Sequence, residues 1–109
     1  MISWNDFEKI DIRTGTVIDV HDFPEARNPS YKLTIDFGEL GIKHSSAQIT
    51  KLYTKEDLLT KQIVAVVNFP PKQIANFMSE CLVLGVVGDD KEVTLLSPGM
   101  KTQNGLRIG

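Results

Sequence analysis

The residues best suited to bind a ligand are concentrated in one connection, residues 68–80. It places apolar rings beside hydrogen-bonding side chains, whereas an ordinary connection is short and polar. Pro70 and Pro71 end any strand that enters it, because proline has no N–H to donate to a sheet. We predict a shallow apolar groove with a polar rim here, and we assign to it Asn68, Phe69, Pro70, Phe77, Met78, Ser79 and Glu80.

Two other segments carry side chains of the same kinds. The proline-bounded loop 23–30 supplies Phe23, Pro24 and Arg27, and the polar end of a predicted strand supplies Ser45, Ser46 and Gln48. Taken singly, such polar residues are more often caps or turn residues than ligand contacts. The phenylalanines likewise have a second interpretation, as plugs that close the ends of a core. We predict that all six residues belong to the same binding surface.

Apolar and polar residues alternate along most of the chain, which predicts strands. Ser3 and Thr54 are typical caps of short helices, and Gly15 predicts a bulge or sharp bend in the first strand. The predicted strands are 12–21, 31–37, 41–48, 63–69, 81–87 and 92–96, and the predicted helices are 3–9 and 54–59. This order predicts an all-β protein, a five-stranded OB-fold barrel with short helices. The length fits one domain, residues 1–109.

The strands around residues 63–69 and 81–87 are apolar on both faces. Val64, Val66, Val83 and Val87 therefore need cover on both sides of the sheet, and in so small a chain a second copy is the simplest source. We therefore expect a homodimer. The helix at 3–9 has an apolar stripe that we expect to plug the end of the core; packing on a second subunit is the alternative.

The composition narrows the class of function. A net charge of -2 gives no general attraction to nucleic acid or to anionic membranes. His21 and His44 are not at metal-ligand spacing, and no catalytic or phosphate-binding pattern is present, so we predict neither an enzyme nor a cofactor. The single cysteine, Cys81, excludes a disulfide framework within the monomer. We expect a cytoplasmic protein without membrane insertion, since no signal peptide or apolar span is present.

Several motifs together resemble the tRNA-binding domain family, and within it the CsaA branch of small secretion chaperones. The resemblance covers almost the whole chain. Its motifs are Asp11–Val17, Phe23–Arg27, Tyr31–Leu33, Ile35–Gly38, Ser45–Ile49, Val67–Ile74 and Phe77–Leu84.

This resemblance implies an OB-fold homodimer that acts as an export-related chaperone and binds unfolded or precursor polypeptides. The matching segments line the substrate pocket in that branch, which favours a binding role for Phe23, Phe69 and Phe77. The alternatives are a protein that grips tRNA across the dimer and a dimerisation module without a ligand. The tRNA-binding relatives carry Ser-x-Gly-Met where this chain has Met78–Leu82. Glu80 in that stretch would repel a phosphate.

Overall fold

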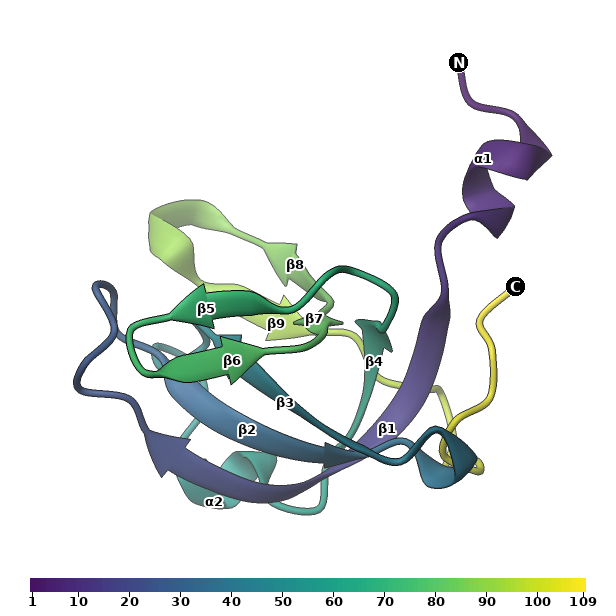
Figure 1. Cartoon of the computed structure of the whole chain (residues 1–109). Coiled ribbons are helices and arrows are strands. Elements are labelled where there is room, and N and C mark those ends of the chain that lie inside the picture. Colours follow the sequence, from purple (N-terminus) through teal and green to yellow (C-terminus); the bar gives the residue numbers. More distant parts are fainter.

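The computed structural model describes residues 1–109, and its centre is an antiparallel five-stranded sheet curved into a nearly closed barrel (Figure 1). The strand order is β3-β2-β1-β4-β7. This confirms the predicted all-β barrel of the OB type with short helices. The bounds of the strands are β1 (Ile12–Asp22), β2 (Tyr31–Asp36), β3 (Ile42–Ala47), β4 (Gln62–Val66) and β7 (Leu82–Val83).

Two hairpins extend from the barrel. The first joins β5 (Lys72–Ile74) to β6 (Phe77–Ser79), inside the connection for which no strand was predicted. The second joins β8 (Gly85–Val87) to β9 (Val93–Leu95) through a 3-10 turn at Asp89–Lys91. The predicted strand 81–87 is split at Leu84, whose N–H bonds to Val64 in the sheet while its carbonyl accepts from Leu96 in the second hairpin.

The interior of the barrel is filled by aliphatic and aromatic side chains from every long strand. On β2 the alternation predicted from the sequence is confirmed, because Tyr31, Leu33 and Ile35 are buried and the residues between them are not. The helix α2 (Lys55–Leu58) begins with a capping box between Thr54 and Asp57 and buries Leu58 completely. The largest fully buried side chains are Phe37, Leu33, Ile35, Leu58, Ile63 and Val17.

The long strand β1 pairs with a different neighbour along each of its two halves. It pairs with β4 through residues 12–16 and with β2 through residues 16–22. A bulge was expected at Gly15, but the register shifts at Ile18. Gly15 pairs regularly with Ile63 and has another purpose: a Cβ there would lie 2.7 Å from side-chain atoms of both Ile35 and Phe37. The glycine therefore makes room for the core.

The N-terminal helix α1 (Trp4–Glu8) stands away from the barrel, and none of its residues is buried (Figure 1). The expectation that it plugs the core is therefore wrong. Its start is fixed by a capping box between Ser3 and Asp6. Neither α1 nor α2 is long and apolar enough to cross a bilayer.

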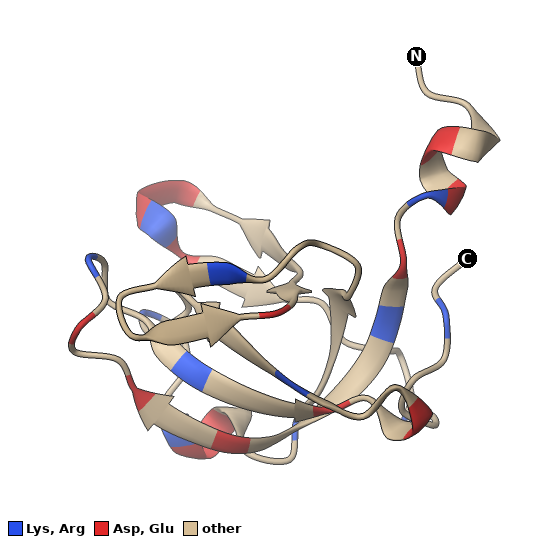
Figure 2. Cartoon of the chain, viewed as in Figure 1, with Lys and Arg blue, Asp and Glu red and all other residues tan.

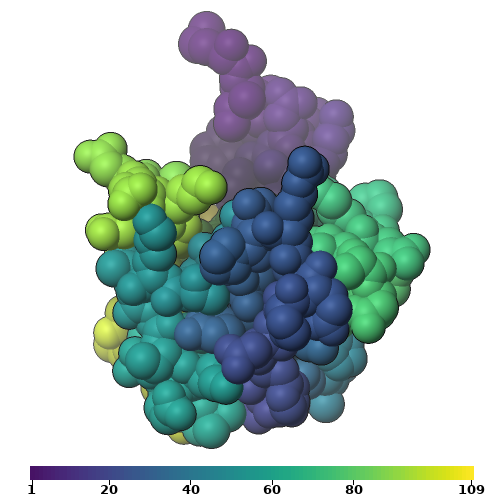
Figure 3. Space-filling view, turned by 90° about the vertical axis from the view of Figure 1, so that its left-hand side faces the viewer, coloured from purple at the N-terminus to yellow at the C-terminus, as the bar shows by residue number.

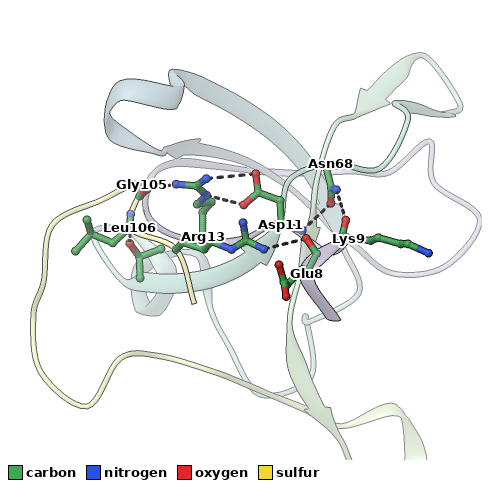
Figure 4. Close-up of polar contacts among 9 residues, drawn as sticks. Glu8, Lys9, Asp11, Arg13, Asn68, Gly105 and Leu106 are labelled. Atoms are coloured by element: carbon green, nitrogen blue, oxygen red, sulfur yellow. Dashed lines mark hydrogen bonds and ion pairs between the residues drawn. The ribbon is translucent and has the colours of Figure 1, made fainter. Parts of the chain in front are cut away.

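Hydrogen bonds hold the base of α1 against the barrel (Figure 4). The side chain of Asn68 donates to the Lys9 carbonyl at 2.7 Å and accepts from the Asp11 N–H at 3.0 Å. Arg107 donates to the carbonyl of Glu8 at 3.0 Å. The helix is thus exposed but held in a fixed direction.

The fold contradicts part of the argument for a dimer, namely that the valines of β4 need cover from a second copy. Val64 and Val66 are buried within the single chain, so they need no cover from a partner. Val83 is half-buried against the core cluster. Val87, by contrast, is 78% exposed. Trp4 on α1 and Val86 and Val87 on β8 are among the apolar residues that remain exposed.

The close approach at Gly15 can be tested by adding a methyl group. We expect Gly15→Ala to lower the free energy of unfolding by about 1–3 kcal/mol, because Ile35 and Phe37 are fully buried and cannot move aside. Gly99→Ala is the matched control, since a Cβ there meets no atom within 4 Å. Urea melts of both variants provide the measurement, and equal stabilities would contradict this account of Gly15.

Candidate functional site

A hollow of about 340 Å³ lies between the end of β3, the segment after β4 and the β5–β6 hairpin. We call it the hairpin groove. Six of the residues that were assigned to binding from the sequence line it: Ser46, Gln48, Phe69, Pro70, Ser79 and Glu80. The other lining residues are Lys72, Ile74, Cys81 and Leu82. The fold therefore brings together side chains from three separate segments of the chain.

The groove offers a ligand both apolar surface and free hydrogen-bonding groups. Phe69 is 54% exposed, and Leu82 is also exposed, so apolar surface is available. Gln48 forms no hydrogen bond within the chain, either through its side chain or through its main chain. Its donors and acceptors are therefore free for a ligand.

Ser79 and Glu80 first serve to close the barrel. The Glu80 carboxylate accepts from the His44 N–H at 2.9 Å and lies 3.1 Å from His44 Nδ1, while the Glu80 N–H donates to the His44 carbonyl at 2.8 Å. The Ser46 N–H donates to the Ser79 hydroxyl at 3.1 Å. Partial burial alone would raise the pKa of Glu80, but the hydrogen bonds from His44 outweigh it and hold that pKa below its usual value.

Ser45 and Cys81 lie behind the groove. Ser45 is fully buried, and its hydroxyl donates to the Cys81 carbonyl at 2.9 Å. Burial raises the pKa of the Cys81 thiol to about 11, even though a hydrogen bond with Ser45 lowers it. The thiol therefore stays protonated at neutral pH, and Ser45 contacts the core instead of the open hollow.

Phe23 and Phe77 form a second cluster with Lys32 and His44. The Phe23 and Phe77 rings pack edge to face with their centroids 5.4 Å apart, and Phe77 lies 6.2 Å from the His44 ring. Lys32 Nζ lies 5.4 Å from the Phe23 centroid and 5.9 Å from that of Phe77. Phe23 is only 3% exposed, so it acts mainly as a plug that anchors the hairpin; Phe77 is half-buried.

The remaining residues assigned from the sequence do not line the hairpin groove. Pro24 and Arg27 are exposed in the β1–β2 loop, which lies at the same end of the barrel as the tips of both hairpins (Figure 1 and Figure 3). Met78 is exposed on β6, where it alternates with Phe77 and Ser79 and so points to the opposite face of the hairpin. Asn68 is occupied at the base of α1.

Sequence reasoning missed four residues of the site. Lys72, Ile74 and Leu82 line the groove, and His44 supports it through Glu80. The missed signal was a hairpin pattern, two three-residue runs on either side of the two-residue loop Ala75–Asn76. Pro70 and Pro71, which precede the first run, obscured this hairpin pattern because they indicate the end of a strand.

Lys72 and Glu80 are the only charged residues of the groove and have opposite signs. Figure 2 shows basic and acidic residues interspersed along the chain. No three His, Cys, Asp or Glu residues are placed to hold a metal ion.

Comparison with known proteins places this arrangement in a family. The family described as "Putative tRNA binding domain" matches residues 12–107. The chain belongs to the tRNA-binding domain family. It is of the CsaA type, because its structure is similar to the chaperone CsaA of Bacillus anthracis with a TM-score of 0.96 and 56% identity, covering 100% of this chain and 99% of that one. CsaA of Picrophilus torridus is similar with a TM-score of 0.94 and 55% identity over 100% of both chains.

The family also includes parts of larger enzymes. Methionine–tRNA ligase of Thermococcus onnurineus is 33% identical over 107 residues, which is 98% of this chain. The chain spans only 14% of the length of that ligase. The similarity is thus to one segment of the ligase.

The link between His44 and Glu80 predicts a pH dependence of stability. The folded-state pKa of Glu80 is below the ordinary value of 4.5, so its contribution is present above pH 4.5 and is lost as the pH falls through the lower, folded value. We expect Glu80→Gln to melt at a lower temperature than the wild type at pH 7 and the difference to shrink toward pH 3. Thermal melts across this range are the measurement. A difference that is constant with pH would show that the charge of Glu80 has no part in holding the hairpin.

Proposed function

We propose that this protein is a non-catalytic chaperone that binds unfolded or precursor polypeptides in the hairpin groove and acts in protein export. The observation that carries the proposal is the groove itself, in which the exposed ring of Phe69 lies beside the unpaired Gln48. Similarity to two proteins described as CsaA chaperones supports it. A cytoplasmic location and contact with the export machinery belong to the same proposal.

The exposed apolar surface suits weak and reversible holding. Burying the exposed half of a side chain such as Phe69 or Leu82 contributes about 1 kcal/mol. Several such contacts, together with hydrogen bonds at the rim, are needed for micromolar binding, which corresponds to about 8 kcal/mol. A chaperone that must release its client requires affinity in this range and not tighter.

Binding of tRNA is the second candidate function. The family description and the match to methionine–tRNA ligases favour it. The net charge of -2 and the carboxylate of Glu80 in the groove weigh against it, because both repel phosphate. We therefore place polypeptide first among the partners and tRNA second.

Homodimerisation is part of the proposal, with α1 as the contact. Trp4 is 80% exposed, and a hollow beside α1 is lined by Ile2, Ser3, Trp4, Phe7 and Gly109. Asn68 and Arg107 hold the C-terminal end of α1 in place although none of the residues of the helix is buried. Large exposed apolar surface of this kind is typical of an interface.

Variants of two rings distinguish binding from stability. We expect Phe69→Ala to weaken binding of a carboxymethylated unfolded polypeptide by about fivefold, with a loss of stability below about 1 kcal/mol, since the ring is half exposed. Phe23→Ala is the contrast, because truncation of this buried ring should cost about 3–5 kcal/mol of stability. Binding isotherms and melts on both variants are needed. If Phe69→Ala binds the polypeptide like the wild type, the groove is misassigned.

Salt distinguishes the two candidate ligands. Affinity for the unfolded polypeptide should change little between about 50 and 200 mM salt, whereas tRNA held through several phosphates should lose about a hundredfold or more. Each labelled ligand is offered alone and then against the other. A flat salt response of polypeptide binding together with failure of tRNA to compete supports the first candidate. Tight, salt-sensitive binding of tRNA alone would replace it with the second.

The dimer is tested through Trp4. We expect sedimentation at micromolar concentration to give twice the chain mass of 12.2 kDa. Trp4→Ala should raise the dissociation constant of the dimer about thirtyfold, the effect of a tryptophan at the centre of an interface. Met100→Ala is the control, because Met100 is equally exposed at 81% but lies outside α1. A wild type that sediments as a monomer would remove the dimer from the proposal.

A further inference from the structure

The strand β8 has a free edge. It pairs only with β9, and the two strands form a separate two-stranded sheet. The Gly88 N–H donates to the Glu92 carbonyl at 2.8 Å, and the Leu96 N–H donates to the Leu84 carbonyl at 3.1 Å. These two bonds show that the main-chain hydrogen-bonding groups of the even-numbered residues of this segment face β9. Since hydrogen-bonding direction alternates along a strand, the main-chain groups of Gly85 and Val87 point away from β9.

Although β8 is only three residues long, it carries no charged residue and no proline to protect its free edge. Edge strands commonly carry a lysine, a proline or another charge that prevents pairing with a further chain. The sequence of β8 is Gly-Val-Val, and Val86 and Val87 are 58% and 78% exposed. An unprotected apolar edge is a template for an added strand.

An apolar hollow of about 330 Å³ lies along the same strand. Val87 and Val93 line it from the β8–β9 hairpin, Val83 lines it from β7, and Gln48 and Ile49 line it from the segment after β3. None of its lining residues is charged. It shares Ser46, Gln48 and Leu82 with the hairpin groove, so the two hollows are neighbours.

We propose that the free edge of β8 binds an extended, uncharged polypeptide segment as a third strand of the β8–β9 hairpin, with alternate apolar side chains in the adjoining hollow. The inference rests on the proposed function and adds the conformation in which the client is held. The absence of charge favours polypeptide over nucleic acid, because a phosphate would find no counter-charge there. Because the hollow neighbours the hairpin groove, one extended client segment can reach both.

Strand addition would make recognition tolerant of sequence. Hydrogen bonds from an edge strand go to the main chain of the added segment, which all sequences share. Selection acts only at alternate positions, where side chains face the hollow. An unfolded client therefore needs only a short apolar run without charges.

Val87→Pro tests the edge directly. Proline removes the N–H that points away from β9, so the hydrogen bonds within the hairpin are retained. The probe is a fluorescent heptapeptide in which serine and valine alternate, with neutral ends. We expect Val87→Pro to weaken its binding about tenfold and the matched variant Val87→Thr, which keeps the N–H and the branched shape, to change it less than threefold. If Val87→Pro does not fold, Val87→Lys supplies the blocking change through a charge on the edge.

Amide hydrogen exchange gives an independent readout. On addition of the heptapeptide, exchange at Gly85 and Val87 should slow, while exchange at Val86, which already faces β9, should change little. Normal binding by Val87→Pro, with weaker binding by Phe69→Ala, would overturn the strand-addition inference and leave the proposed function intact. Failure of the wild type to bind either the heptapeptide or unfolded polypeptide would instead overturn the proposed function. Conversion of a dimer to a monomer by Val87→Pro would assign the edge to a second copy and also overturn the inference.

Discussion

The outer edge of β3 has no strand partner, and the rest of the molecule depends on how that edge is satisfied. The five-stranded sheet ends at β3 on one side and at β7 on the other, and the two strands do not form a ladder. The Ser79 and Glu80 side chains and one main-chain group act in place of the missing strand. Ser79 accepts from Ser46, and Glu80 accepts from the His44 N–H through its carboxylate and donates to the His44 carbonyl through its own N–H. Because these groups belong to the β5–β6 hairpin and its exit, closing the barrel also sets the position of the hairpin. Beyond Ser46 the closure stops, and Gln48 is left unpaired at the wall of the groove.

Much of the fold could be predicted because its signals are local. The alternation in Tyr31–Asp36 is a property of neighbouring residues, and the buried face of β2 follows it. The capping residues Ser3 and Thr54 likewise act within one helical turn, and both helices begin where the sequence indicated. Where an element is determined by a few adjacent residues, a single sequence is sufficient to predict it.

The features that the sequence did not reveal depend on contacts between residues that are distant in the chain. A glycine in a strand indicates either a bulge or a close approach, and for Gly15 the choice depends on Phe37, which the strand pattern does not reveal. Six of the groove residues were identified from their chemical type, since their segments place apolar residues beside hydrogen-bonding side chains. Phe23 shows the limit of that reasoning, because only its packing on Phe77 reveals that it is buried. The direction of α1 has no signal in the helix itself and depends on Asn68 and Arg107.

Asn68 joins two parts of the molecule that would otherwise be independent. Its side chain bonds to Lys9 and Asp11 at the base of α1, and the next residue in the chain, Phe69, lines the groove. One peptide bond therefore separates the support of the helix from the wall of the groove. If α1 contacts a second copy and the groove holds a client, as proposed, a displacement of α1 that strains the Asn68 hydrogen bonds would also strain the main chain at Phe69. Assembly and client release would then be mechanically coupled through two adjacent residues.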